Sequence, residues 1–178
     1  GHRNFIKNMI TGASQADVAL LMIPADGNFT AAIAKGNHKA GEVPGQTRQH
    51  ALLINLLGVK QLIVGINKMD ADMAHYKKER YDEIKDEMDR MLIRVGWPKK
   101  FIDESVPKLP LSGWKGDNLI TKTTNMDWWK GCDIKIGKKD LHIDTLLDAL
   151  ENMVTVPERA KDAVMRTPIS GIYKIKGI

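Results

Sequence analysis

Four consecutive residues, Asn67, Lys68, Met69 and Asp70, carry the side chains needed to select guanine. Guanine presents an N1–H and an exocyclic amine, two parallel donors that the carboxylate of Asp70 can accept together. Adenine has a lone pair at N1, which would leave the same carboxylate unpaired and repelled. A site built on such hydrogen bonds rejects the wrong ligand by roughly 10⁴–10⁵-fold. The Lys68 stem can lie over the plane of the base, and Asn67 can tie the loop to its neighbours.

The place of this tetrapeptide in the chain suits a binding loop. It follows residues 61–66, Gln-Leu-Ile-Val-Gly-Ile, an apolar run that predicts a buried parallel strand. In open α/β sheets, ligands bind at the carboxyl ends of such strands. The alternative is an ordinary polar turn between a strand and a helix, since three fixed letters occur by chance in roughly one of fifty chains of this length. A second motif is therefore needed to support the site.

Ser112, Gly113 and Trp114 supply that second motif. They follow the short apolar stretch 106–111, which predicts another strand, and one long helix separates them from the first loop. Backbone N–H groups in this turn can reach the carbonyl oxygen of guanine. Gly113 permits close approach of the backbone, and Trp114 can cover the edge of the base. Alone, the triplet indicates a tight turn, and only its pairing with residues 67–70 favours a nucleotide site.

Together with residues outside these loops, the two motifs resemble those of translational GTPases. Residues 1–12, Gly-His-Arg-Asn-Phe-Ile-Lys-Asn-Met-Ile-Thr-Gly, are similar to the second-switch segment of the elongation factor 1-alpha family and of its bacterial counterpart, elongation factor Tu. The resemblance extends over the whole chain, from Gly1 to Ile178. The segment at residues 26–44 is longer than in the standard factor and differs from it in sequence. There the chain resembles the elongation-factor-like paralogue (EFL) of some single-celled eukaryotes. The eukaryotic form is matched by four further segments, residues 14–17, 45–48, 58–61 and 112–118.

The resemblance assigns a catalytic role near the start of the chain. In the family, Asp-x-Pro precedes Gly-His, the histidine orients the water that attacks the γ-phosphate of GTP, and the glycine offers a backbone N–H to that phosphate. Phosphoryl transfer depends mostly on positioning, so one well-placed imidazole changes its rate strongly. The resemblance thus implies that His2 is catalytic, whereas a histidine near a chain end without this context is more often idle. The implied nucleotide-binding residues are Gly1, Asn67, Lys68, Met69, Asp70, Ser112, Gly113 and Trp114.

The same resemblance implies cofactors and partners. The cofactors are GTP or GDP with Mg²⁺, and the metal ligands are expected upstream of Gly1, as are the phosphate-binding loop and the first switch. The intact protein is expected to carry aminoacyl-tRNA to the ribosome, to hydrolyse GTP there, and to release GDP with a guanine-nucleotide exchange factor. This fragment alone is expected to be inactive as a GTPase.

Two other functions stay open at this point. One is another translational-type GTPase, acting in termination, ribosome rescue or sulfate activation, which shares Gly-His and Asn-Lys-x-Asp. The other is a non-catalytic module that binds RNA or the cytoskeleton through a basic surface. The net charge of +5 and the pI near 9.2 permit a polyanionic partner without requiring one.

The apolar pattern predicts an α/β fold of alternating strands and helices. The uninterrupted apolar run at residues 17–24 is expected to be a central strand of the sheet. Residues 46–57, 77–95 and 143–154 predict helices, the first two ended by Gly58 and Gly96. The expected fold is a P-loop GTPase-type, mostly parallel sheet flanked by helices and lacking its N-terminal part. The first of these helices is expected to carry four leucines on its apolar side, Leu52, Leu53, Leu56 and Leu57.

Three segments are expected along the chain. Residues 1–156 are the C-terminal portion of a GTP-binding domain, residues 157–163 a linker, and residues 164–178 the beginning of a second domain, a β-barrel, by its resemblance to the family. Hydrophobic residues at 43% and charged residues at 28% are ordinary for a globular protein. We expect a cytoplasmic protein without a membrane span, because no long apolar run occurs and the single cysteine, Cys132, cannot form an internal disulfide.

The remaining candidate segments are read as structural. Residues 131–139 imitate a phosphate-binding loop, but five residues rather than four separate the glycines, and Lys139 replaces the Ser or Thr that would hold Mg²⁺. This segment is expected to be a basic surface loop. Trp128 and Trp129 can stack on RNA bases, but we prefer an aromatic pair that anchors a long loop over the last helix. No metal is assigned, since the spacing of the histidines fits no ligand set: His38, His50, His75 and His142.

Overall fold

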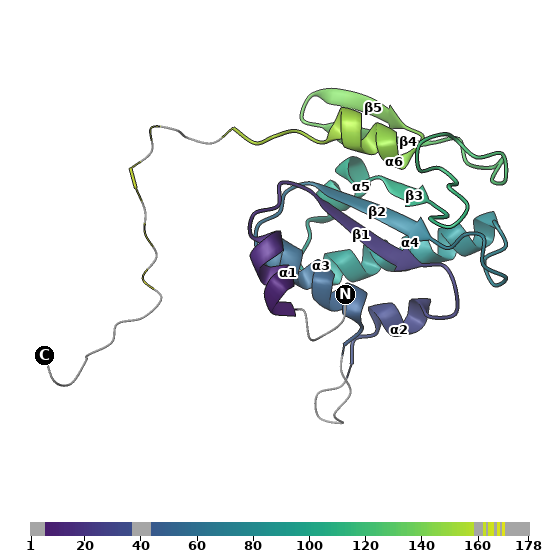
Figure 1. Cartoon of the computed structure of the whole chain (residues 1–178), viewed down its shortest axis with the longest axis horizontal. Coiled ribbons are helices and arrows are strands. Elements are labelled where there is room, and N and C mark those ends of the chain that lie inside the picture. Colours follow the sequence, from purple (N-terminus) through teal and green to yellow (C-terminus); the bar gives the residue numbers. More distant parts are fainter. Residues whose placement is uncertain are drawn as a thin grey trace, which may run out of the picture.

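The computed structural model describes residues 6–36 and 44–158, together with residues 162, 164, 165, 167 and 169. Its main sheet consists of three parallel strands in the order β1 (Ala19–Pro24), β2 (Leu62–Asn67) and β3 (Lys108–Pro110) (Figure 1). An antiparallel hairpin of β4 (Cys132–Ile136) and β5 (Lys139–Ile143) lies beyond β3, above the sheet in this view. The expected α/β fold, with parallel strands flanked by helices, is confirmed.

The helices lie on both sides of this sheet. In Figure 1, α1 (Ile6–Ala13) and α3 (Gln46–Leu56) lie below the strands, whereas α6 (Leu146–Asp148) lies above them beside the hairpin. A π-helical turn at Ala149–Met153 continues α6. The other helices are α2 (Phe29–Ile33), α4 (Lys78–Arg94) and α5 (Lys99–Ser105).

Strand β2 is the centre of the core and is followed by the first predicted recognition loop, residues 67–70. All its residues from Leu62 to Ile66 are buried, as expected for a strand covered on both faces. Gly65 is required by space, because a Cβ there would lie 2.7 Å from the Met22 sulfur and 2.9 Å from Leu111 Cδ1. The central strand is therefore pinned by close packing just before the loop begins.

Strand β1 differs from its expected place. Within the described residues it pairs only with β2, so it lies at an edge of the sheet rather than at its centre. Leu20 and Met22 are 41% and 40% exposed, on the side of the strand opposite Leu21 and Ile23. An apolar run alone does not tell a central strand from an edge strand whose second face is only partly covered.

Helix α4 matches its prediction closely. Its buried residues recur at intervals of three and four, and Gly96 follows the helix with φ +105°. The helix packs against the sheet and leaves its charged face to solvent. The buried residues of α4 are Tyr81, Ile84, Met88, Met91 and Leu92.

Helix α3 has the predicted length but a different buried face. Leu52 and Leu56 are 42% and 74% exposed, while the buried residues are Thr47, Ala51 and Ile54. The predicted apolar side is therefore not the buried side at Leu52 and Leu56, whereas Leu53 and Leu57 are half-buried. The helix does stop just before Gly58, which has a φ of +78°, and the Val59 N–H donates to the Ile54 carbonyl oxygen at 3.1 Å.

The C-terminal part of the chain differs from the predicted secondary structure in two places. Residues 131–139, expected to be a basic surface loop, contain β4 and the turn of the β4–β5 hairpin. The last helix begins at Leu146 rather than at residue 143, because Ile143 ends β5 and Thr145 forms a capping box with Asp148. Most residues of the expected linker and barrel segment lie outside the described residues, so those boundaries stay predictions. None of the described helices has the length and apolar character needed to cross a bilayer.

Candidate functional site

Asn67 joins the two predicted recognition loops directly. Its side-chain Oδ1 accepts a hydrogen bond from the Lys68 N–H at 2.8 Å and another from the Gly113 N–H at 2.8 Å. One acceptor thus serves the loop after β2 and the loop after β3. The role proposed for Asn67 from the sequence, tying its loop to its neighbours, is confirmed.

Lys68 holds an unusual backbone conformation. Its φ of +65° lies in the left-handed region, which a non-glycine residue adopts only when its surroundings enforce it. Its ammonium forms an ion pair with Asp26 at 2.7 Å. This hydrogen bond from Lys68 lowers the pKa of Asp26, so the pair contributes stability at neutral pH that is lost as the pH falls through the Asp26 pKa.

Met69 and Asp70 differ in burial and in their contacts. The Met69 side chain is fully buried, so it contributes to core packing. Its backbone N–H donates to the Leu111 carbonyl oxygen at 3.1 Å, and its carbonyl oxygen accepts from the Tyr76 N–H at 2.8 Å. The Asp70 carboxylate accepts a hydrogen bond from the Ser112 hydroxyl at 2.6 Å through Oδ1. Its Oδ2 has no protein partner among the described residues. Each carboxylate oxygen has two lone pairs, so both oxygens of Asp70 can still accept from a ligand.

The second loop presents a buried serine and an exposed tryptophan. Ser112 is fully buried, and its hydroxyl oxygen also accepts a hydrogen bond from the Lys115 N–H at 3.0 Å. Gly113 is exposed, and a Cβ there would meet Asn67 at an ordinary 3.5 Å, so the loop requires no glycine in the absence of ligand. Trp114 is 86% exposed. The structure thus brings Asn67, Asp70, Ser112 and Gly113 together and leaves the Trp114 ring open to solvent.

A buried carboxylate, Asp117, holds the second loop from behind. It is 7% exposed, and Oδ1 accepts from the Thr123 hydroxyl at 2.6 Å and the Asn125 amide at 3.0 Å. Oδ2 accepts from the Tyr76 hydroxyl at 2.9 Å, and the Ser112 N–H donates to the Asp117 carbonyl oxygen at 3.2 Å. Asp117 therefore fastens the Ser112 turn to two other loops. Sequence reasoning matched this residue to the family but gave it no role.

Removing this carboxylate is expected to loosen the site. Asp117→Ala would leave the donors of Tyr76, Thr123 and Asn125 without their acceptor, and the free energy of unfolding should fall by about 2–4 kcal/mol. Asp117→Asn keeps the acceptor for Thr123 and Asn125, so it should cost less. Urea denaturation measures both, with Asp127→Ala, at an exposed position, as the control. A loss no larger for Asp117→Ala than for Asp127→Ala would refute the anchoring role.

The tryptophan pair anchors the loop that follows. The Trp128 Nε1–H donates to the Tyr76 carbonyl oxygen at 2.7 Å, and the Trp129 Nε1–H donates to the Asp144 carbonyl oxygen at 2.9 Å. Both rings contact Tyr81 of α4, with centroids 5.2 Å and 5.7 Å away. The prediction that this aromatic pair anchors a loop is confirmed, but both rings pack on α4, and the expected place over the last helix stays a prediction. Burial and the hydrogen bond to Asp117 also raise the pKa of Tyr76 to about 12, so its hydroxyl remains a donor.

Other predicted residues are not brought to this site. Gly1 and His2 lie outside the described residues, so their roles stay predictions. Among the residues that the structure describes, no group of three or more His, Cys, Asp and Glu side chains is arranged to hold a metal ion. Burial raises the pKa of Cys132 to about 11, which leaves its thiol protonated and unreactive.

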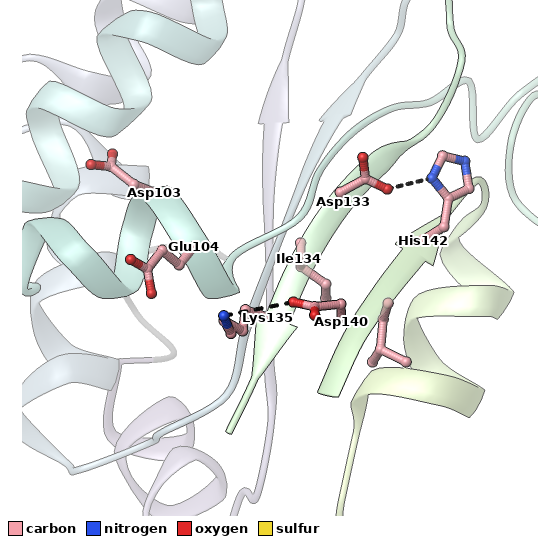
Figure 2. Close-up of a pocket in the computed structure, with 8 residues that line it drawn as sticks. Asp103, Glu104, Asp133, Ile134, Lys135, Asp140 and His142 are labelled. Atoms are coloured by element: carbon pink, nitrogen blue, oxygen red, sulfur yellow. Dashed lines mark hydrogen bonds and ion pairs between the residues drawn. The ribbon is translucent and has the colours of Figure 1, made fainter. Parts of the chain in front are cut away.

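A separate cavity of about 520 Å³ lies between α5 and the β4–β5 hairpin (Figure 2). It shares no residue with the recognition loops, and its carboxylates would repel a nucleotide phosphate. Figure 2 shows Asp133 paired with the His142 ring and Asp140 facing Lys135. The distance between Asp133 Oδ1 and His142 Nδ1 is 2.7 Å. The carboxylates along it are Asp103, Glu104, Asp133 and Asp140.

The pair on this hairpin predicts a pH effect. The hydrogen bond to Asp133 raises the pKa of His142 above its usual 6.5. The pair should therefore stabilise the fold below about pH 6.5 and lose this contribution as the pH rises through the His142 pKa. Because His142 is 52% exposed, the effect should stay below about 1 kcal/mol. NMR titration of the ring should show a pKa that returns towards 6.5 in Asp133→Asn; an unchanged value would contradict the pairing.

The sequence of this chain is similar to known GTP-binding proteins. Residues 1–156 match the family model described as the elongation factor Tu GTP binding domain. The elongation factor 1-alpha proteins of Blastocystis hominis and Entamoeba histolytica are each 48% identical over 179 aligned residues, which cover 100% of this chain and 36% and 34% of theirs. The chain thus spans about a third of the length of these relatives.

Two solved structures are similar over most of the chain. The crystal structure of sup35 complexed with GDP superposes with a TM-score of 0.61 and 34% identity, covering 80% of this chain and 30% of that one. The structure of sup35 complexed with GMPPNP gives a TM-score of 0.62 and 32% identity over the same shares.

Proposed function

Since the chain belongs to the elongation factor Tu family of GTP-binding domains, we propose that it forms the base-recognition part of the GTP site of a translation elongation factor. In the intact protein this site would bind GTP, deliver aminoacyl-tRNA to the ribosome and hydrolyse GTP there. GDP release would be assisted by a guanine-nucleotide exchange factor, and the protein would act in the cytoplasm. The identity of 48% to elongation factor 1-alpha, against 32–34% to the sup35 chains, favours elongation over the alternatives.

The observation that carries this proposal is the placement of Asp70. Its carboxylate lies at the end of a buried central strand, is fixed by Ser112, and keeps lone pairs on both oxygens for a ligand. Asn67 holds the neighbouring loop at a fixed distance through the Gly113 N–H. Such a preformed pair of acceptors fits the N1–H and exocyclic amine of guanine and no other common base.

The remaining roles follow from this placement. Lys68 would cover one face of the base with its stem, Trp114 would cover its edge, and backbone N–H groups near Gly113 would meet the guanine carbonyl oxygen. Met69 would serve through its backbone. His2 would orient the attacking water and Gly1 would contact the γ-phosphate. Mg²⁺ would accompany the nucleotide phosphates, although the described residues include no cluster of ligands for it.

The test is nucleotide competition on the full-length protein that contains this chain. A fluorescent GDP should be displaced by GTP and GDP at concentrations at least a thousandfold lower than by ATP and ADP, given the hydrogen-bond discrimination expected at Asp70. Equal displacement by adenine nucleotides, or no binding of GDP at all, would overturn the proposal. Salt-sensitive RNA binding without nucleotide would instead support the non-catalytic module.

We also propose that the protein is the EFL paralogue of elongation factor 1-alpha. The support is the length and sequence of the segment at residues 26–44, of which residues 37–43 lie outside the described ones. Relatives with the same longer segment should group with this chain over residues 45–156 as well. Grouping with the standard factors over that range would overturn the paralogue assignment and leave the GTPase assignment intact.

A further inference from the structure

The turn after β1 is fastened to the recognition loop at several points. The Ala25 N–H donates to the Asn67 carbonyl oxygen at 2.7 Å, which continues the pairing of β1 and β2 into the loops. From α4, Arg80 donates through Nε to the Ala25 carbonyl oxygen at 3.0 Å and through Nη2 to the Asp26 carbonyl oxygen at 3.1 Å. The guanidinium lies over the buried Phe29 ring, 5.5 Å from its centroid. The backbone of Asp26 is therefore held from two sides.

The Asp26 side chain is equally constrained. Oδ1 accepts a hydrogen bond from the Asn28 N–H at 2.9 Å, and Oδ2 accepts one from the Asn28 side-chain amide at 3.2 Å. Oδ2 also receives the Lys68 ammonium at 2.7 Å. The carboxylate is only 21% exposed, compared with 52% for the lysine side chain. An acceptor fixed by several hydrogen bonds thus holds the end of a longer and more exposed side chain.

The start of the Lys68 side chain is fixed as well. Its left-handed φ of +65° is held by the hydrogen bond from the Lys68 N–H to Asn67 Oδ1. With the backbone set at one end and the ammonium set at the other, the methylene stem between them has few conformations left. Both ends must be constrained for the stem to present a defined apolar surface.

We propose that Asp26 is a positioning residue for base recognition, which holds the Lys68 ammonium so that the lysine stem is presented to the plane of the guanine base. The inference rests on the proposed function and deepens it. Asp26 does not touch the nucleotide; it acts through Lys68. Because a methylene stem packs on any purine, Asp26 contributes equally to the affinities for guanine, hypoxanthine and xanthine nucleotides. Asp70 determines which of these nucleotides binds most tightly.

The variant that tests this is Asp26→Asn in the full-length protein. The amide oxygen can still accept from the Asn28 N–H, but the side chain loses the charge that attracts the Lys68 ammonium. Affinities for GDP and for IDP, which lacks the exocyclic amine, should both fall about fivefold, the effect of a partly exposed ion pair. Asp72→Asn is the matched control, since it removes one negative charge from an exposed position near the same loop; its GDP affinity should stay within twofold.

A double-mutant cycle separates positioning from general loop damage. In the Lys68→Ala background, Asp26→Asn should cause no further loss of GDP affinity, because the side chain it positions is gone. An equal loss in both backgrounds, or unchanged GDP affinity in Asp26→Asn alone, would overturn the inference while wild-type GDP binding keeps the proposed function. Failure of the wild-type protein to bind GDP would overturn both.

Discussion

Replacing Asp70 by Asn is expected to turn a site that prefers guanine into one that prefers xanthine. Xanthine carries a carbonyl oxygen where guanine has its exocyclic amine, so the new amide can donate to it while its own oxygen accepts from N1–H. The variant loses one good pairing with guanine and gains one with xanthine, each worth about 2 kcal/mol. The ratio of GDP to XDP affinities should therefore change by roughly a thousandfold. Competition against a fluorescent nucleotide on the full-length protein measures this ratio.

Ser112 predicts how the new amide will be oriented. Its hydroxyl donates to Oδ1 of Asp70, so the oxygen of an asparagine should occupy that position and the amide nitrogen should occupy the free Oδ2 position. The exocyclic group of the base is then read at Oδ2. Ser112→Ala in the Asp70→Asn background should weaken the preference for xanthine, since the amide can then turn over. Asp72→Asn should leave the ratio unchanged; unaltered selectivity in Asp70→Asn would remove Asp70 from the site.

Replacing Trp129 by Ala is expected to destabilise the fold by about 3–5 kcal/mol, the usual cost of deleting a large buried aromatic side chain. Trp129 is 5% exposed and packs edge-on against Tyr81 and Trp128, at centroid distances of 5.7 Å and 6.4 Å. Its loss would also leave the Asp144 carbonyl oxygen without the indole donor. Chemical denaturation of the variant measures the loss in the free energy of unfolding.

Trp114→Ala is the matched control for this prediction. The same residue type is removed from a position that is 86% exposed, so stability should change by less than about 0.5 kcal/mol. Affinity for GDP should instead fall, because Trp114 is the residue assigned to the edge of the base. A large loss of stability in Trp114→Ala, or none in Trp129→Ala, would contradict these assignments.

The parts of the site that follow in sequence could be predicted, because strand ends and short polar motifs are local. Residues 67–70 follow an apolar run, and the end of a parallel strand is where a ligand meets the sheet. The contact between Asp70 and Ser112 could be expected in outline, since two neighbouring strands place their loops together. Asp26 and Asp117 could not, since their partners are set by how loops after different strands meet in space. No periodicity marks a carboxylate that holds a lysine in the loop after another strand.

Burial on the helices and in the hairpin shows a second limit. Leu52 and Leu56 are as apolar as any core residue, yet the buried face of α3 is the one with Ala51 and Ile54. Apolar character alone therefore does not identify which face of a helix meets the sheet. The hairpin was missed because its lysines and carboxylates dominate residues 132–140 and obscure the alternation of Ile134 and Ile136. Charge at exposed strand positions tells little about whether the strand exists.

The burial of Met69 has a consequence for how this region can change over evolution. The motif Asn-Lys-x-Asp suggests that any residue is tolerated at its third position. In this protein that position is Met69, whose side chain has no exposed surface. A polar or charged replacement would have to be buried in the core at a desolvation cost, next in sequence to the residues proposed to recognise the base. Variation at position 69 should therefore be confined to apolar side chains of similar volume. Other substitutions there should change nucleotide affinity indirectly, by displacing the neighbouring loop residues.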